Sequence, residues 1–92
     1  MIPRSIIWAL AGEPLVVFGD GQQTRDFTYV EETAEYLHRL MECDDAVGEV
    51  FNICRGIESS ITELAHAIIK LTQSSSEVLM QPERPSDLRR LC

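Results

Sequence analysis

The sequence predicts a small α/β domain in which helices alternate with short, mostly parallel strands. Three stretches carry apolar residues at helical spacing. Short runs rich in Val, Ile and Phe lie between them, and clusters of glycine, proline or serine separate the two kinds of segment. Strands that alternate with helices are typical of a layered α/β arrangement. Because 92 residues can form only one core of moderate size, we expect residues 1–92 to be a single domain.

The first third of the chain predicts a helix and two strands. A helix is expected to begin at Pro3, which suits a first turn, and to end at Gly12. The apolar run Leu15–Phe18 predicts a short strand. The following Gly19-Asp20-Gly21 predicts a tight reversal, because glycine adopts the positive φ that such turns require. A second strand is expected over Asp26–Val30.

The rest of the chain predicts two further helices and two further strands. Residues 31–41 predict an amphipathic helix, and Val50–Ile53 predicts a short strand that is buried. Ser60 and Glu63 have the spacing of a capping box, so a helix is expected over 61–71. A last strand is expected at 77–80.

Charge and composition exclude several classes of function. A net charge of −7 disfavours non-specific binding to nucleic acid or to an anionic membrane surface. The cysteines Cys43, Cys54 and Cys92 are widely spaced and, with two histidines, form no metal-ligand motif. The apolar run Ile6–Ala11 is shorter than a signal peptide or a membrane span requires. We therefore expect a soluble, cytoplasmic protein with reduced thiols and no metal site.

Arg25 is the first candidate for ligand binding. It follows the glycine turn and stands beside Asp26, so the reversal can place its guanidinium near an exposed strand edge. A planar guanidinium offers several directed donors and suits a diphosphate better than an ammonium group. The alternatives are an ion pair with Asp26 or an ordinary surface arginine.

Arg84 and Asp87 form a second candidate pair within the loop 82–87. Pro85 stiffens this loop, which lowers the entropic cost of holding both side chains in place. A carboxylate can accept hydrogen bonds from ribose hydroxyls, and an arginine can reach a phosphate. The alternative is a proline-rich surface loop with a local salt bridge.

Val16 and Phe18 are candidates through their backbone groups. Residues i and i+2 of a strand direct their N–H and C=O groups to the same edge. If that edge is free, it can pair with the imide edge of uracil or thymine. The alternative is that both side chains simply belong to the core, and the two roles are compatible.

Five segments together resemble one family. These are IPRSIIWALAGEPL (2–15), LVVFGDGQQTRDFTYV (15–30), VGEVFNI (47–53), the helix at 61–71 and Arg84-Pro85-Ser86-Asp87. The chain resembles the NAD-dependent nucleotide-sugar epimerases and dehydratases, which are extended short-chain dehydrogenases/reductases, and UDP-glucose 4-epimerase-like members most of all. The resemblance implies that the chain is the C-terminal, nucleotide-sugar-binding portion of such a Rossmann-type enzyme. It also implies a diphosphate contact for Arg25, a base contact from Val16 and Phe18, and ligand contacts from Arg84 and Asp87.

The catalytic and cofactor-binding signatures of that family do not occur in this sequence. No G-x-G-x-x-G spacing is present, and Gly19-Asp20-Gly21 leads into a strand instead of a helix. Tyr29 is followed four positions later by Thr33, so it is not part of a Tyr-x-x-x-Lys pair. We therefore expect no catalytic residue here and no cofactor bound by this chain alone, whereas the parent family uses NAD. We expect that the chain alone does not transfer hydride.

Two functions remain open at this point. In the first, the chain binds a UDP- or TDP-sugar as the substrate portion of an NAD-dependent enzyme, as a homo-oligomer or beside a complementary cofactor-binding chain. Alternatively, it is a small self-associating structural protein that kept the fold and lost ligand binding. No nucleophile–base pair or paired carboxylate supports a standalone enzyme of another kind.

Overall fold

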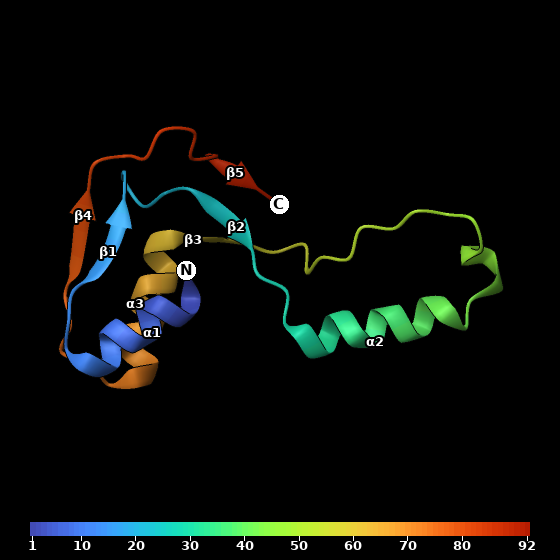
Figure 1. Ribbon diagram of the computed structural model, residues 1–92, viewed down its shortest axis with the longest axis horizontal. Coiled ribbons are helices and arrows are strands. Elements are labelled where there is room, and N and C mark those ends of the chain that lie inside the picture. Colours follow the sequence, from blue (N-terminus) through green and yellow to red (C-terminus); the bar gives the residue numbers. More distant parts are fainter.

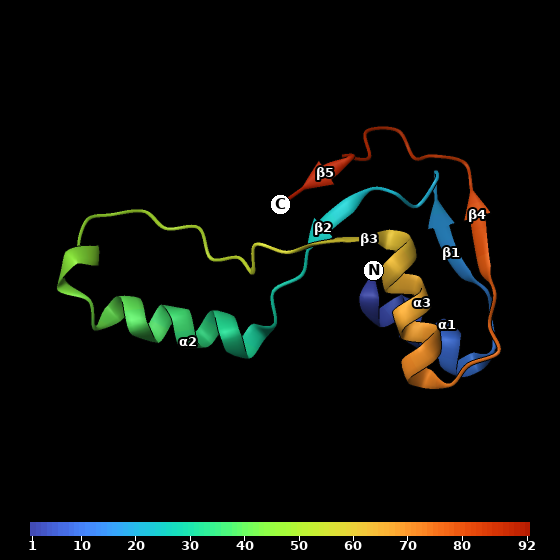
Figure 2. The same ribbon diagram turned by 180° about the vertical axis from the view of Figure 1, so that it is seen from behind.

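The computed structural model describes all residues, 1–92, and divides into a layered body and a projecting arm (Figure 1). The arm consists of residues 27–57. The Cα radius of gyration of the whole chain, 16.7 Å, exceeds the value of about 12 Å expected for a compact domain of 92 residues. The whole molecule measures 50 × 29 × 16 Å. The arm accounts for this elongation, because it runs away from the body and returns to it (Figures 1 and 2).

The body is built on a two-stranded parallel sheet, covered by two helices. Strand β1 (Leu15–Phe18) pairs with β4 (Val78–Gln81). Helices α1 (Ile2–Ala11) and α3 (Ile61–Thr72) pack against each other and against β1 (Figure 1). The buried apolar residues come from these three elements and are Ala9, Leu15, Val17, Ile61, Ala65 and Ile68.

Local sequence signals explain how the two body helices begin and end. Helix α1 ends at Gly12, which adopts φ 73° as its C-cap. Helix α3 begins with the predicted capping box. The Ser60 hydroxyl accepts from the Glu63 N–H at 3.1 Å, and the Glu63 carboxylate accepts from the Ser60 N–H at 2.8 Å.

A second, three-stranded sheet lies beside the first. Its central strand is β2 (Thr24–Asp26), antiparallel to β3 (Glu58–Ser60) and parallel to β5 (Arg90–Leu91). The Gly19–Gly21 turn joins the two sheets. The Gly21 carbonyl accepts from the Thr62 N–H at 3.0 Å and from its hydroxyl at 3.1 Å, which ties this turn to the first turn of α3.

The predicted α/β class is confirmed, whereas two predicted strands are wrong. The expected strand over Asp26–Val30 ends at Asp26, and Val30 already begins helix α2 (Val30–Met41). Asp26 is the last residue of β2 that pairs in the sheet, opposite Glu58, and its carboxylate accepts from the N–H groups of Arg55, at 3.2 Å, and Gly56, at 2.7 Å, where the arm returns.

The segment Val50–Ile53 is neither a strand nor buried. Val50 is 93% exposed and Phe51 is 52% exposed. A strand needs a neighbour for its N–H and C=O groups, and no strand of the chain lies beside this segment. Strands β3 and β5, by contrast, were not predicted.

The arm contains α2 and a short 3-10 helix, η1 (Asp44–Ala46), and none of its residues is fully buried. Phe27, at its start, packs against the core, whereas no residue of α2 is buried and the main contacts of α2 with another element are those with η1. Tyr36, Leu37 and Met41 of α2 are exposed. None of the helices combines the length and apolar character that crossing a lipid bilayer would require.

Candidate functional site

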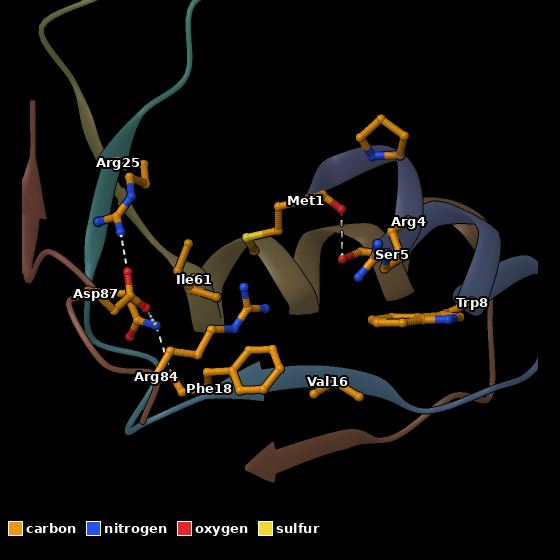
Figure 3. A pocket seen from close by; sticks show the side chains of 12 residues that line it. Met1, Arg4, Ser5, Trp8, Val16, Phe18, Arg25, Ile61, Arg84 and Asp87 are labelled. Atoms are coloured by element: carbon orange, nitrogen blue, oxygen red, sulfur yellow. Dashed lines mark hydrogen bonds and ion pairs between the residues drawn. The ribbon is translucent and has the colours of Figure 1, made fainter. Parts of the chain in front are cut away.

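A hollow of about 510 Å³ opens between α1, β1, β2 and the loop that follows β4 (Figure 3). All five residues that the sequence singled out line it: Val16, Phe18, Arg25, Arg84 and Asp87. They come from three regions of the chain, because β1, β2 and the loop 82–89 converge here. The sequence therefore selected residues that the fold brings together, although their role in binding stays a prediction.

Arg25 is held at one end of the hollow by several acceptors. Its Nη1 donates to the carbonyl oxygens of Thr24, at 2.7 Å, and Leu88, at 2.8 Å, and its Nη2 donates to Asp87 Oδ1 at 2.8 Å. The ion pair thus forms with Asp87 and not with the adjacent Asp26. A guanidinium has five N–H donors, and these three bonds leave two for a ligand. Its fixed orientation would reduce the entropic cost of binding.

Arg84 occupies the middle of the hollow and has no carboxylate partner. Its Cζ lies 3.7 Å from the centroid of the Phe18 ring, which is a close cation–π contact (Figure 3). No hydrogen bond or ion pair to another residue engages its guanidinium, and the local salt bridge with Asp87 that was the alternative interpretation of this loop does not form. The aromatic face orients this cation while all of its donors remain available.

One edge of β1 is not covered by another strand. The N–H groups of Leu15 and Gly19 donate to Glu77 and Gln81 on the β4 side. Since alternate residues of a parallel strand bond in opposite directions, Val16 and Phe18 direct their groups to the other edge. No strand pairs there, although the Phe18 carbonyl accepts from the Gln23 side-chain amide at 2.8 Å.

Gln23 is a residue of this site that the sequence did not reveal. It is buried, lines the hollow, and donates from Nε2 to the Phe18 carbonyl and, at 3.5 Å, to Asp87 Oδ2. Asp87 is therefore held by both Arg25 and Gln23. Nothing in the local sequence distinguishes Gln23 from the adjacent, exposed Gln22.

Arg4 and Trp8 of α1 also line the hollow and were not predicted. A signal existed, because residues four apart share one face of a helix. With Arg4, Arg25 and Arg84 against Asp87 alone, the lining side chains carry a net charge of +2 in a protein of net charge −7. The hollow is therefore locally positive in an otherwise acidic molecule.

The turn beside the hollow is fixed by a charged contact. The Asp20 carboxylate accepts from the Gln22 N–H at 2.9 Å and from Arg89 at 2.8 and 2.9 Å. The bond from the Gln22 N–H and the contact with Arg89 lower the pKa of Asp20. This pairing attaches the Gly19–Gly21 turn to the chain segment that carries Asp87.

Comparison with known proteins places this architecture in a family. A model of the NAD dependent epimerase/dehydratase family matches residues 1–54, more than half of the chain. The chain belongs to this family.

Its relatives act on nucleotide sugars, as their names state. This chain is 45% identical over 82 residues to a UDP-N-acetyl-alpha-D-glucosaminuronate decarboxylase of Bacillus cytotoxicus, and the match covers 89% of this chain and 25% of that protein. It is 36% identical over 90 residues to a dTDP-glucose 4,6-dehydratase of Neisseria gonorrhoeae, covering 98% of this chain and 24% of that protein. The chain thus spans about a quarter of the length of these relatives.

Solved structures of the family share the fold, including the arm. The UDP-N-acetylglucosamine 4-epimerase of Methanobrevibacter ruminantium, in complex with UDP-N-acetylmuramic acid, superposes with a TM-score of 0.89 at 36% identity. That match covers 98% of this chain and 28% of the epimerase. The UDP-glucuronic acid 4-epimerase of Bacillus cereus, in complex with UDP-glucuronic acid and NAD, superposes with a TM-score of 0.84 at 30% identity. That match covers 97% of this chain and 29% of the epimerase.

The residues of this chain do not fit the pyrophosphate of NAD. Such a site requires a glycine-rich turn between a strand and the free N-terminus of a helix. Strand β3 runs directly into α3, where Ser60 and Glu63 already cap the helix. Gly19 and Gly21 instead join β1 to β2. No cluster of three or more His, Cys, Asp or Glu side chains is placed to hold a metal ion either.

Proposed function

We propose that this chain is the C-terminal, nucleotide-sugar-binding portion of an NAD-dependent epimerase/dehydratase, forming one partial domain over residues 1–92. The diphosphate of a UDP- or TDP-sugar lies between Arg25 and Arg84. The observation that carries this proposal is the convergence of these two guanidinium groups on one hollow whose lining has a net charge of +2. A nucleotide diphosphate sugar carries two negative charges at neutral pH, which matches that value.

The other lining residues have complementary roles in this proposal. The free edge at Val16 and Phe18 pairs with the base. Asp87 orients Arg25 through the 2.8 Å ion pair, and its remaining lone pairs accept from ribose hydroxyls. The names of the relatives, which act on UDP- and dTDP-sugars, support this choice of ligand.

In this proposal the chain binds the ligand, and another portion of the enzyme carries out the chemistry. The hollow contains no residue placed for proton transfer to a sugar carbon, and the chain has no turn that fits NAD. A complementary cofactor-binding portion, like the rest of the longer relatives, would supply NAD and the reacting groups. The chain alone then binds nucleotide sugar without converting it.

Calorimetry with UDP tests the proposal most directly. Arg84→Gln removes a cation that makes no hydrogen bond within the protein, so a loss of affinity reports on the ligand and not on folding. Because a hydrogen bond to a charged group contributes roughly 1.5–3 kcal/mol, we expect UDP to bind about 10- to 100-fold more weakly. Arg39→Gln, on the exposed face of α2, is the matched control and should bind UDP normally. No heat of binding at millimolar UDP would refute the proposal.

A second candidate function is self-association through the arm, and the exposure of the arm favours it. A helix of 12 residues such as α2 is marginally stable alone in water, and large exposed apolar patches favour association. We propose that a second copy of this chain covers the arm. Light scattering should then show a dimer that Phe51→Glu dissociates, whereas Leu71→Glu, an exposed apolar position on the body, leaves it intact. A monomer at every concentration would contradict this candidate.

A further inference from the structure

We propose that Gln23 is a positioning residue that makes the hollow prefer a ribonucleoside diphosphate to its 2′-deoxy counterpart. Gln23 acts through Asp87 and need not touch the ligand itself. This inference rests on the proposed function, in which Asp87 accepts from ribose hydroxyls. It chooses between the two ligand classes named there, because dTDP carries a 2′-deoxyribose.

Gln23 is fixed in place by both its backbone and its side chain. It is buried, and its backbone carbonyl accepts from the Ile61 N–H at 3.1 Å, which ties it to the start of α3. Its side-chain Nε2 donates to the Phe18 carbonyl at 2.8 Å. A buried amide keeps such partners, because a hydrogen bond left unmade inside a protein is costly. Gln23 is therefore a rigid reference point beside the mobile part of the site, the loop 82–89.

The amide of Gln23 also faces the second oxygen of Asp87. Arg25 Nη2 donates to Asp87 Oδ1 at 2.8 Å (Figure 3), and Gln23 Nε2 lies 3.5 Å from Asp87 Oδ2. With the Arg25 contact alone, the carboxylate could rotate about its terminal bond, which has a broad torsional minimum. A donor at each oxygen holds the plane of the carboxylate fixed, although every other residue of the loop 82–89 is exposed.

A carboxylate held in this way suits a pair of adjacent hydroxyl groups. An ionised carboxylate has about four lone-pair sites, so each oxygen of Asp87 keeps one for a ligand. The two free sites lie side by side, as do the 2′- and 3′-hydroxyls of ribose, whereas a 2′-deoxyribose fills only one of them. A site that hydrogen-bonds a hydroxyl discriminates against the analogue that lacks it. The Asp87 side chain is 26% exposed, so water reduces this penalty without removing it.

Calorimetry with UDP and 2′-deoxy-UDP, which share the base and the diphosphate, isolates the contribution of the 2′-hydroxyl. We expect UDP to bind about 10-fold more tightly, at the low end of the range for a hydrogen bond to a charged group. Gln23→Met has a similar length and no donor, so it should reduce this preference to about 2-fold or less as Asp87 becomes free to rotate. A purely structural role would weaken both ligands equally and leave the preference unchanged.

Gln23→Glu adds a pH-dependent readout. Near neutral pH the new carboxylate offers no donor and repels Asp87, so the preference should again fall to about 2-fold. A carboxyl beside another carboxylate is protonated more readily, and its O–H is then a donor. The preference should therefore return toward about 10-fold as the pH falls to about 5. The other charged side chains that line the hollow, or the small cavity on the far side of Gln23, face both ligands alike, so their titration cancels in this ratio; they are Arg4, Asp20, Arg25, Glu83, Arg84 and Arg89.

The adjacent glutamine provides matched controls. Gln22 is exposed, so Gln22→Met and Gln22→Glu make the same chemical changes one residue away and should keep the full preference at every pH. Gln23→Asn retains a buried amide that is too short to contact both Phe18 and Asp87. It should lose the preference as Gln23→Met does, and it replaces that variant if Gln23→Met does not fold.

The outcomes distinguish this inference from the proposed function. If UDP and 2′-deoxy-UDP bind equally well, the inference is refuted and the proposed function survives. If the folded Gln23 variants keep the full preference for UDP, the positioning role is refuted and the proposed function again survives. If neither ligand binds, the proposed function fails, and the inference fails with it.

Discussion

Replacing Gly21 by alanine should destabilise the body strongly, because two independent constraints meet at this residue. Gly21 has φ +71°, which alanine adopts only at a cost of about 1–2 kcal/mol. An added Cβ would also lie 2.0 Å from Thr62 Oγ1 and 3.1 Å from Val17 Cγ1. Neither distance is compatible with the present packing.

The size of the effect follows from what must move. If Thr62 rotates away, it loses its bond to the Gly21 carbonyl, about 1 kcal/mol. Val17 is fully buried, so overpacking against it adds about 1–3 kcal/mol. The sum is about 3–6 kcal/mol. Gly12→Ala is the matched control, since Gly12 has φ +73° but no atom within 4 Å of an added Cβ, and it should cost only about 1–2 kcal/mol.

Urea unfolding followed by circular dichroism measures both variants. With a slope of about 1 kcal/mol per molar urea for a small protein, the midpoint of Gly21→Ala should lie about 2–4 M below that of Gly12→Ala. Thr62→Ala removes the closest atom, so Gly21→Ala should cost about 1 kcal/mol less in that background. Equal midpoints for Gly21→Ala and Gly12→Ala would refute the reasoning, because the cost of a positive φ at alanine would then account for the whole destabilisation.

Three further predictions concern stability and its relation to the site. Ser60→Ala should lower the stability by about 1 kcal/mol through loss of the α3 cap, with Ser60→Asp retaining most of it, as measured by thermal unfolding; an unchanged melting temperature for Ser60→Ala would contradict the role of the cap. The pKa values of Asp20, Glu58 and Glu63 are lowered, chiefly by hydrogen bonds from the Gln22 N–H, from Arg90 and from the Ser60 N–H respectively. The stability that these three carboxylates contribute is therefore complete above their unfolded-state pKa of about 4 and is lost as the pH falls further. The free energy of unfolding should decline below about pH 4, and it should decline less steeply in Asp20→Asn. Arg25→Gln should lower the melting temperature because it leaves Asp87 without its cationic partner, whereas Arg84→Gln should not. Calorimetric scans of both variants measure this, and equal losses would show that Arg84 is also structural.

Features that depend on a few adjacent residues could be predicted from the sequence. The cap of α3 and the end of α1 at Gly12 rest on contacts within a short segment. The apolar run of β1 is continuous in the sequence, although its partner strand β4 is distant. The strands β3 and β5 could not be predicted, because they contain only three and two residues and exist only through pairing with β2. Val50–Ile53 shows the converse: strand-forming residues form no strand where no partner strand is available.

The candidate site likewise combines features of single residues with features that depend on tertiary packing. The sequence by itself determined which groups carry charge and where the chain can reverse, since guanidinium chemistry and the φ range of glycine belong to single residues. Only the tertiary structure decided that Arg25 pairs with Asp87, 62 positions away, that Arg84 stacks on Phe18, and that Arg4 and Trp8 face the same hollow. These relations depend on how β1, β2, α1 and the loop 82–89 pack against one another, and no local pattern encodes that packing.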